Sequence, residues 1–146
     1  MTYRAKCPNC SHEFEVNPVY MIADKSNTAF KVVEKLKRWI NKQQEYSLLI
    51  CLNTRMVITK IKVIHIGTLD SGFMHPREVF AEALKQHAAS IIIAHNHPSG
   101  EIKPSQEDRD TTSKIKQAGE MMGINLIDSL IIGKTGYYSF AEMGEL

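Results

Sequence analysis

The most constraining feature of the sequence is an apolar run, Ser90-Ile-Ile-Ile-Ala94, followed at once by His95-Asn-His97-Pro-Ser-Gly100. An apolar run of this length that ends in residues typical of turns predicts a buried strand leading into a loop. Side chains alternate along a strand, so we expect the imidazoles of His95 and His97 to point the same way. The sequence therefore predicts a strand that delivers two nitrogen ligands to one edge of a sheet.

The segments around this strand alternate between helical and strand patterns. Apolar residues from Ala29 to Ile40 have the spacing of one amphipathic helix, and the opposite face carries Lys31, Lys35, Arg38 and Lys42. His75-Pro-Arg-Glu78 predicts the start of a second helix, and Ser105 that of a third, which Gly123 ends. The buried stripe of the second helix is predicted to be Val79, Phe80, Ala83 and Leu84.

The predicted strands cover residues 46–52, 57–66, 90–94, 124–132 and 137–140, and the second alternates through Val57, Thr59, Ile61 and Val63. Asn53-Thr54-Arg55 and Gly133-Lys-Thr-Gly136 read as turns between strands. This order predicts the α/β class, as a sandwich with a mixed, mostly antiparallel sheet flanked by helices.

Composition narrows the classes of protein. The chain has 146 residues, 43% hydrophobic and 23% charged, which fits one globular domain. No stretch approaches the roughly 20 apolar residues of a membrane span. A formal net charge of +2 gives no argument for nucleic-acid binding from bulk charge. Three cysteines and an N-terminus without a signal-peptide pattern lead us to expect a reduced, cytoplasmic protein.

Residues 1–27 are predicted to be an appendage to a single domain of residues 28–146. Cys7-Pro-Asn-Cys10 has the spacing of half a zinc ribbon, but a structural zinc site takes four ligands and the chain has no second pair. Two interpretations stay open: a half-site that a second chain completes or that has been lost, and an inert remnant. Cys51 lies in an apolar strand and is predicted to be a buried thiol.

Three metal ligands are predicted to converge. Asp108 lies in the first turn of the third helix, and a loop bracketed by prolines returns that turn towards His95 and His97. Catalytic zinc sites use three protein ligands and leave the fourth position to water, so this set predicts an open, hydrolytic site. The alternatives are a structural histidine pair and a capping box formed by Ser105 and Asp108, a role that is compatible with catalysis.

Activation of a zinc-bound water requires a base. Glu45 stands where an apolar strand begins and is the first candidate; Glu78 is the alternative, although its place in the first turn of a helix is explained by the helix dipole. His65, His75 and His87 are interpreted as structural, with His75 also a candidate for the pocket wall.

One set of spacings resembles the JAMM (JAB/MPN) metalloprotease motif: His95-x-His97, then seven residues before Ser105, then two residues before Asp108. The string HNHPSG…PSxxD resembles the RadC-like branch of that superfamily. The resemblance extends from about residue 28 to the end, through Glu45, Gly67-Thr-Leu-Asp70, His75-Pro-Arg-Glu78 and Tyr137-Tyr-Ser139. It implies a cytidine-deaminase-like sandwich, one catalytic zinc ion bound by His95, His97 and Asp108, Glu45 as acid and base, and Ser105 as a donor to the oxyanion.

The chain departs from the RadC-like pattern in two places. Cys7 and Cys10 stand where such proteins usually carry a helix-hairpin-helix region, which weakens an inherited role on DNA. Asp128-Ser129 stands where they commonly have Asp-His, at none of the motif positions.

The leading hypothesis is a zinc-dependent metallohydrolase that cleaves a peptide or isopeptide bond of a protein substrate. The alternative is a protein of DNA repair or of mobile elements that binds or cuts DNA, with the basic face of the first helix as one contact; a third hypothesis is an inactive scaffold. We expect specificity to lie in residues 67–75 and 98–104, and exposed strand edges to favour a homodimer.

Overall fold

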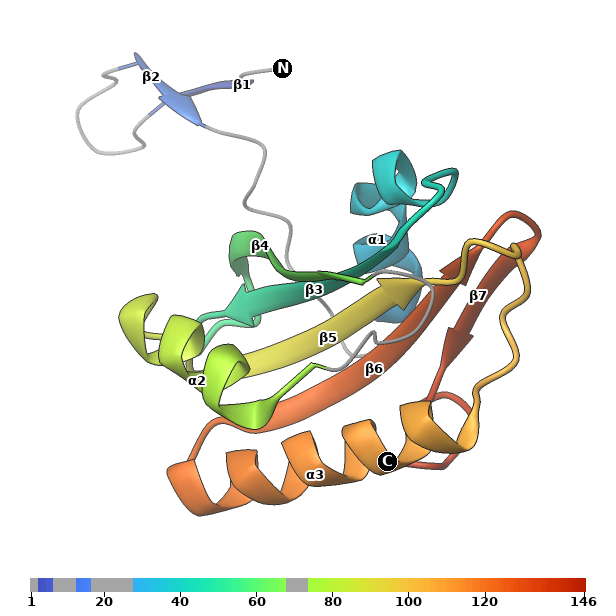
Figure 1. Cartoon of the computed structure of the whole chain (residues 1–146). Helices are drawn as coiled ribbons and strands as arrows, with labels where there is room; N and C mark the ends of the chain where they lie inside the picture. Colours follow the sequence, from blue (N-terminus) through green and yellow to red (C-terminus); the bar gives the residue numbers. More distant parts are fainter. Residues whose placement is uncertain (1–2, 7–12, 17–27, 68–73) are drawn as a thin grey trace.

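A computed structural model describes residues 3–6, 13–16, 28–67 and 74–146 of the chain (Figure 1). Near the N-terminus, β1 (Tyr3–Lys6) and β2 (Glu13–Val16) form an antiparallel two-stranded sheet. Cys7 and Cys10 lie outside the described residues, and so does most of the first predicted specificity loop. The half zinc ribbon and the role of residues 1–27 as an appendage stay predictions.

The rest of the described chain is built on a five-stranded sheet. Its strands are β3 (Glu45–Leu52), β4 (Ile58–Gly67), β5 (Ser90–Asn96), β6 (Asn125–Gly133) and β7 (Gly136–Ser139). They lie in the order β4-β3-β5-β6-β7, and only β5 and β6 are parallel neighbours. The predicted class, a mixed and mostly antiparallel sheet in an α/β sandwich, is confirmed.

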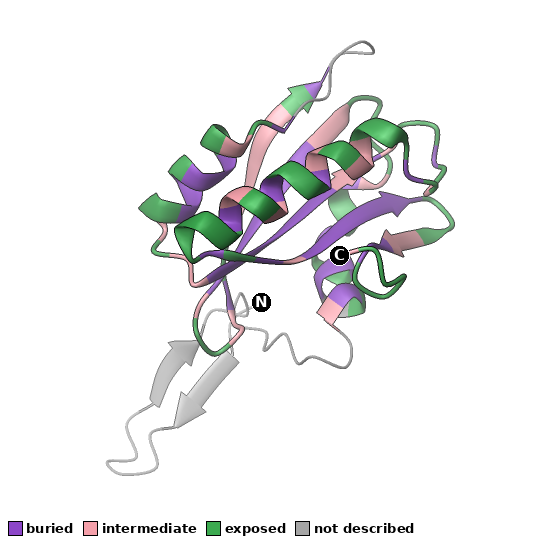
Figure 2. Ribbon diagram, turned by 90° about the horizontal axis from the view of Figure 1, so that it is seen from below, coloured by how far each residue is buried: buried purple, intermediate pink, exposed green. Residues whose placement is uncertain are grey.

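Helices cover both faces of this sheet (Figures 1 and 2). The helix α1 (Thr28–Lys35) packs on one face, where Val32 and Leu36, the residue after the helix, belong to one core cluster with Leu48 and Ile92. The helices α2 (Pro76–Lys85) and α3 (Gln106–Met122) pack on the other, around Leu49, Ile91 and Ile93. Even-numbered residues of β5 therefore face α1 and odd-numbered ones face α3, so the alternation of the strand decides on which side His95 emerges. Among the described residues, no helix has the length and apolarity needed to cross a bilayer.

The first helix is shorter than its apolar pattern predicts. It ends at Lys35, and a 3-10 helix, η1 (Lys37–Trp39), follows. Val33, Leu36 and Trp39 are buried and stand three residues apart, which is the period of a 3-10 helix, so the tighter winding keeps all three on the core. Arg38 lies on η1 with its guanidinium 4.0 Å from the centre of the Trp39 ring. Arg38 therefore does not lie on the α-helix whose face the sequence predicts it to share.

The predicted burial of Leu84 and the predicted alternation along residues 57–66 are both wrong. Leu84 is 54% exposed, and Glu82 takes its place in the buried stripe of α2, because Lys62 of β4 donates to the Glu82 carboxylate at 2.7 Å and neutralises its charge. Thr59 is exposed and Ile58 is buried, because the register between β3 and β4 shifts beside Leu52 and interrupts the alternation. Cys51 is a buried free thiol, as predicted.

Candidate metal centre

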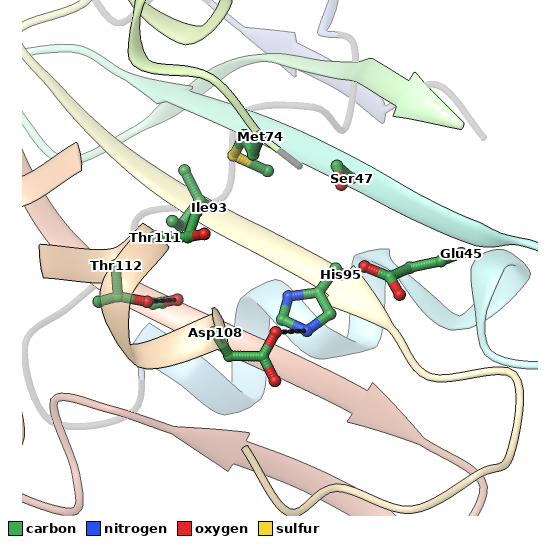
Figure 3. A pocket seen from close by; sticks show the side chains of 9 residues that line it. Glu45, Ser47, Met74, Ile93, His95, Asp108, Thr111 and Thr112 are labelled. Carbon is green, nitrogen blue, oxygen red and sulfur yellow. Dashed lines mark hydrogen bonds and ion pairs between the residues drawn. The ribbon is translucent and has the colours of Figure 1, made fainter. Parts of the chain in front are cut away.

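His95, His97 and Asp108 meet at the carboxyl end of β5, next to the N-terminal turn of α3. The Nε2 atoms of the two histidines are 3.0 Å apart. His95 Nε2 lies 3.1 Å from Asp108 Oδ1, and His97 Nε2 lies 3.4 Å from Asp108 Oδ2. One ligand atom from each residue falls within 4.8 Å of the others, and Figure 3 shows the His95 ring and the Asp108 carboxylate turned towards each other in direct contact. A single ion between them can contact all three.

The loop after β5 holds His97 in place for ligation. Its backbone N–H donates to Ile132 O at 3.4 Å, and its Nδ1 lies 3.0 Å from Glu101 O. Because only a protonated Nδ1 can donate to that carbonyl, the Nε2 lone pair is directed at the site, as in many metal-binding histidines. A Cβ on Gly133 would lie 2.5 Å from Gly100 O, so glycine at 133 lets the loop rest directly on the end of β6.

Asp108 is oriented by a capping box at the start of α3. Ser105 N–H donates to Asp108 Oδ2 at 2.7 Å, and Asp108 N–H donates to Ser105 Oγ at 3.1 Å. The structural alternative for this pair is therefore present in the molecule, and the same bonds hold the carboxylate beside the two histidines. Ser105 is exposed and does not belong to the pocket wall described below. Its role at an oxyanion stays a prediction.

A pocket of about 20 Å³, enough for about one water molecule, opens beside this group (Figure 3). Glu45, the first residue of β3, lines it together with His95 and Asp108. Glu78 is exposed in the first turn of α2 and does not line it. His75 is also exposed, and its Nδ1 accepts from Arg77 N–H, so this residue caps α2 and the prediction that it lines the pocket is wrong.

The charges of the site depend on one another. Burial would raise the pKa of Asp108, but hydrogen bonds with His95 and His97 outweigh it and hold that pKa well below its usual range. The bond to Asp108 raises the pKa of His97. Burial also raises the pKa of the Glu45 carboxyl, and the nearby His95 and His97 reduce this shift. Glu45 is thus an acid whose proton affinity exceeds that of a solvated glutamate.

The remaining walls of the pocket were not identified in the sequence. Thr111 and Thr112 follow Asp108 by three and four residues, so helical spacing carried a signal for both. Ser129 required knowledge of the strand order, since it lies beside Ile93 in the β5–β6 register, and Thr112 Oγ1 donates to its Oγ at 2.9 Å. The departure at Ser129 therefore lies in the pocket wall, although at none of the motif positions. The complete set is Glu45, Ser47, Met74, Ile93, His95, Asp108, Thr111, Thr112 and Ser129.

Comparisons with known proteins place the chain among members of one family. A family model described as "RadC-like JAB domain" matches residues 23–145. A UPF0758 protein of Clostridium novyi is 44% identical over 129 residues, covering 88% of this chain and 55% of the relative. A UPF0758 protein of Thermotoga maritima is 39% identical over 125 residues, which cover 86% of this chain and 56% of the relative. A UPF0758 protein of Clostridium botulinum is 40% identical over 146 residues, which cover 100% of this chain and 60% of the relative. The chain thus spans little more than half the length of these relatives.

Proposed function

This chain belongs to the RadC-like JAB domain family, and from that premise we propose that it is a metal-dependent hydrolase whose His95, His97 and Asp108 hold a zinc ion. The observation that carries the proposal is the convergence of two imidazole nitrogens and one carboxylate oxygen within 4.8 Å. In the described part of the chain, no other group of three such residues is close enough to share an ion.

The ligand set fits zinc. Imidazole and carboxylate are both common zinc ligands, and three protein ligands leave one position for solvent or substrate, as in catalytic rather than structural sites. The contact between His97 Nδ1 and Glu101 O supplies the outer hydrogen bond that usually orients such a ligand. Zinc would supply a lowered pKa for a water molecule and polarisation of the scissile carbonyl.

Glu45 is proposed as the residue that moves the proton. It lines the same pocket as His95 and Asp108, and burial raises its pKa, which suits a group that must first accept and then release a proton. In the proposed reaction, its carboxylate takes a proton from the attacking water and passes it to the leaving nitrogen. The Oγ of Ser105 accepts from Asp108 N–H, so its own hydrogen stays available for the developing oxyanion.

The bond cleaved is proposed to be an amide of a protein substrate, in a peptide or isopeptide linkage. This follows from the motif resemblance and from the chemistry of a metal, a carboxylate base and an oxyanion donor. Because the chain spans little more than half of its relatives, substrate choice is proposed for this domain alone.

The first test is the zinc content of the full chain carrying Cys7→Ser and Cys10→Ser, so that neither thiol contributes. We expect about one zinc per chain, lost in His97→Ala. If the protein is folded, was never exposed to a chelator and holds no zinc, the proposed metal site is refuted.

The second test is a screen of peptide and isopeptide substrates with Glu45→Gln. This variant should keep the zinc and lose turnover, while Glu78→Gln, the matched control on the exposed start of α2, should keep both. Turnover by Glu45→Gln at the native rate would remove Glu45 from the mechanism. Cleavage of DNA but not of any amide, again dependent on Glu45, would replace the amide by a phosphodiester.

A further inference from the structure

Asn96 lies between the two histidines of the site and is completely buried, with an exposed fraction of 0%. It is the last residue of β5, and strand alternation turns its side chain to the face opposite that of His95. Asn96 is therefore not a candidate ligand in the metal pocket. A buried primary amide nevertheless requires hydrogen-bond partners, so its partners indicate what it does.

Both partners of Asn96 are backbone groups at the start of β3. Tyr46 N–H donates to Asn96 Oδ1 at 2.7 Å, and Asn96 Nδ2 donates to Gln44 O at 3.0 Å. One partner is a donor and the other an acceptor, so together they determine which way the amide faces. The residue between these two partners is Glu45.

This contact stands where the backbone pairing of β3 with β5 ends. The register runs from the pair Leu52 and Ser90 to the pair Ser47 and His95, and does not include Tyr46. A carboxamide carries the same oxygen acceptor and N–H donor as a peptide group. The Asn96 side chain thus extends the ladder beyond its last backbone pair. On its other side, Glu45 pairs with Gly67 at the end of β4.

We propose that Asn96 is a positioning residue that holds the Glu45 carboxylate in line with His95 and Asp108. The inference rests on the proposed function, because it assigns Asn96 to the residue proposed as base. A strand end held only by β4 is free to fray, and proton transfer requires heavy atoms within about 3.2 Å of each other. A displacement of about 1 Å costs a reaction on the order of a hundredfold in rate.

The test compares Asn96→Ala and Asn96→Asp with two control variants of the full chain. Gln44→Ala changes an exposed side chain whose backbone carbonyl still accepts from Asn96. Ser139→Ala removes a different buried hydrogen bond, the one that Ser139 Oγ donates to Asp128. Asn96→Asp covers the event that Asn96→Ala does not fold, because an ionised aspartate keeps the shape and the acceptor for Tyr46 but has no donor for Gln44.

The first readout is made on metal-free protein by NMR. In Asn96→Ala, exchange of the Tyr46 amide hydrogen should accelerate about tenfold or more, the equivalent of one lost hydrogen bond, and the side-chain carboxyl resonance of Glu45 should shift or broaden. In Asn96→Asp, the Tyr46 amide should stay protected while the Glu45 carboxyl resonance still shifts. Both controls should leave the two signals unchanged. An unchanged Glu45 resonance in both Asn96 variants would overturn the proposal.

The second readout uses cobalt(II) in place of zinc, because its visible spectrum follows ionisation at the site. All variants should bind one cobalt per chain. The pH of the spectral transition in Asn96→Ala should move from the native value towards that of Glu45→Gln. If the Tyr46 amide exchanges faster in a variant but the pH of its cobalt spectral transition stays at the native value, Asn96 has only a structural role. A native chain that binds no cobalt would refute the proposed function, and the NMR readout would still decide the role of Asn96.

Discussion

Two aspartates on opposite faces of the sheet differ in their exposure and in the groups that surround them. Asp108, on α3, keeps 15% of its side chain exposed and faces two imidazoles. Asp128, on β6, is 3% exposed and accepts from Ser129 N–H at 2.7 Å, Ala141 N–H at 3.0 Å and Ser139 Oγ at 2.5 Å. One carboxylate faces the two histidines of the candidate site, and the other accepts hydrogen bonds from the last strand and the segment after it.

Burial opposes ionisation of both groups, and their partners decide the outcome. The pKa of Asp128 is raised, because burial outweighs the bonds from Ser139, Ala141 and Ser129. The pKa of Asp108 is lowered, because two histidines that carry positive charge when protonated outweigh its burial. An ion can replace the protons of His95 and His97, whereas nothing replaces fixed backbone donors. The kind of partner, rather than depth, separates a candidate ligand from a structural anchor.

The largest expected difference between the two aspartates is in metal affinity. Asp108→Ala removes a proposed ligand and should weaken zinc binding by at least about a hundredfold, since even outer-shell changes cost 10–100-fold in such sites. Asp128→Asn should leave the affinity within about twofold of native, because Asp128 lies on the other face. Competition with a chromophoric chelator measures both. Equal losses of zinc affinity in the two variants would contradict the distinction between a candidate ligand at Asp108 and a structural anchor at Asp128.

Stability of the metal-free protein should reverse this order. Asp128→Ala leaves the buried Ser129 N–H and Ser139 hydroxyl, and the partly buried Ala141 N–H, without their acceptor, and should lower the free energy of unfolding by about 3 kcal/mol. Asp108→Ala removes a helix-capping contact at a partly exposed position and should cost about 1 kcal/mol. Urea unfolding in chelator gives both values. A larger loss at Asp108 would mean that the site is a structural anchor even without metal.

The pH dependence of stability should have opposite signs at the two positions. A lowered pKa stabilises the fold above the ordinary value of 3.8, and this contribution is lost as the pH falls. From about pH 3 to pH 5, the free energy of unfolding of the native protein should therefore rise relative to that of Asp108→Asn. A raised pKa stabilises the fold below 3.8, and this contribution is lost as the pH rises. Above that value, the free energy of unfolding of the native protein should therefore fall relative to that of Asp128→Asn. Urea midpoints in chelator across this range test both signs, and slopes of equal sign would contradict the assignment.

The smallest effect concerns the hydroxyl pair in the pocket wall. Thr112→Val leaves Ser129 without its buried donor and should cost about 1 kcal/mol, whereas adding Ser129→Ala should cost little more, because the pair is then removed as a unit. A double-mutant cycle in urea measures the coupling. Strictly additive losses would show that the two hydroxyls act independently.

The parts of the site that local rules govern were predictable from the sequence. Strand alternation brought His95 and His97 together, and capping chemistry placed Ser105 against Asp108. The same rules failed where contacts between distant segments decide. The register beside Leu52 buried Ile58 in place of its neighbours, and Lys62 made Glu82 a buried residue at the expense of Leu84. Asn96 carried no local signal, because its partners lie 50 and 52 residues earlier in the chain.

That separation along the chain has a consequence for the order of folding. His95, His97 and Asp108 all belong to the end of β5, the loop after it and the first turn of α3, so their meeting requires the closure of only a short loop. Glu45 reaches them only when β3 has paired with β5 across a far longer loop, which closes more slowly. The three proposed ligand residues should therefore assemble first, and the proposed base should join them in a later step of the same folding reaction.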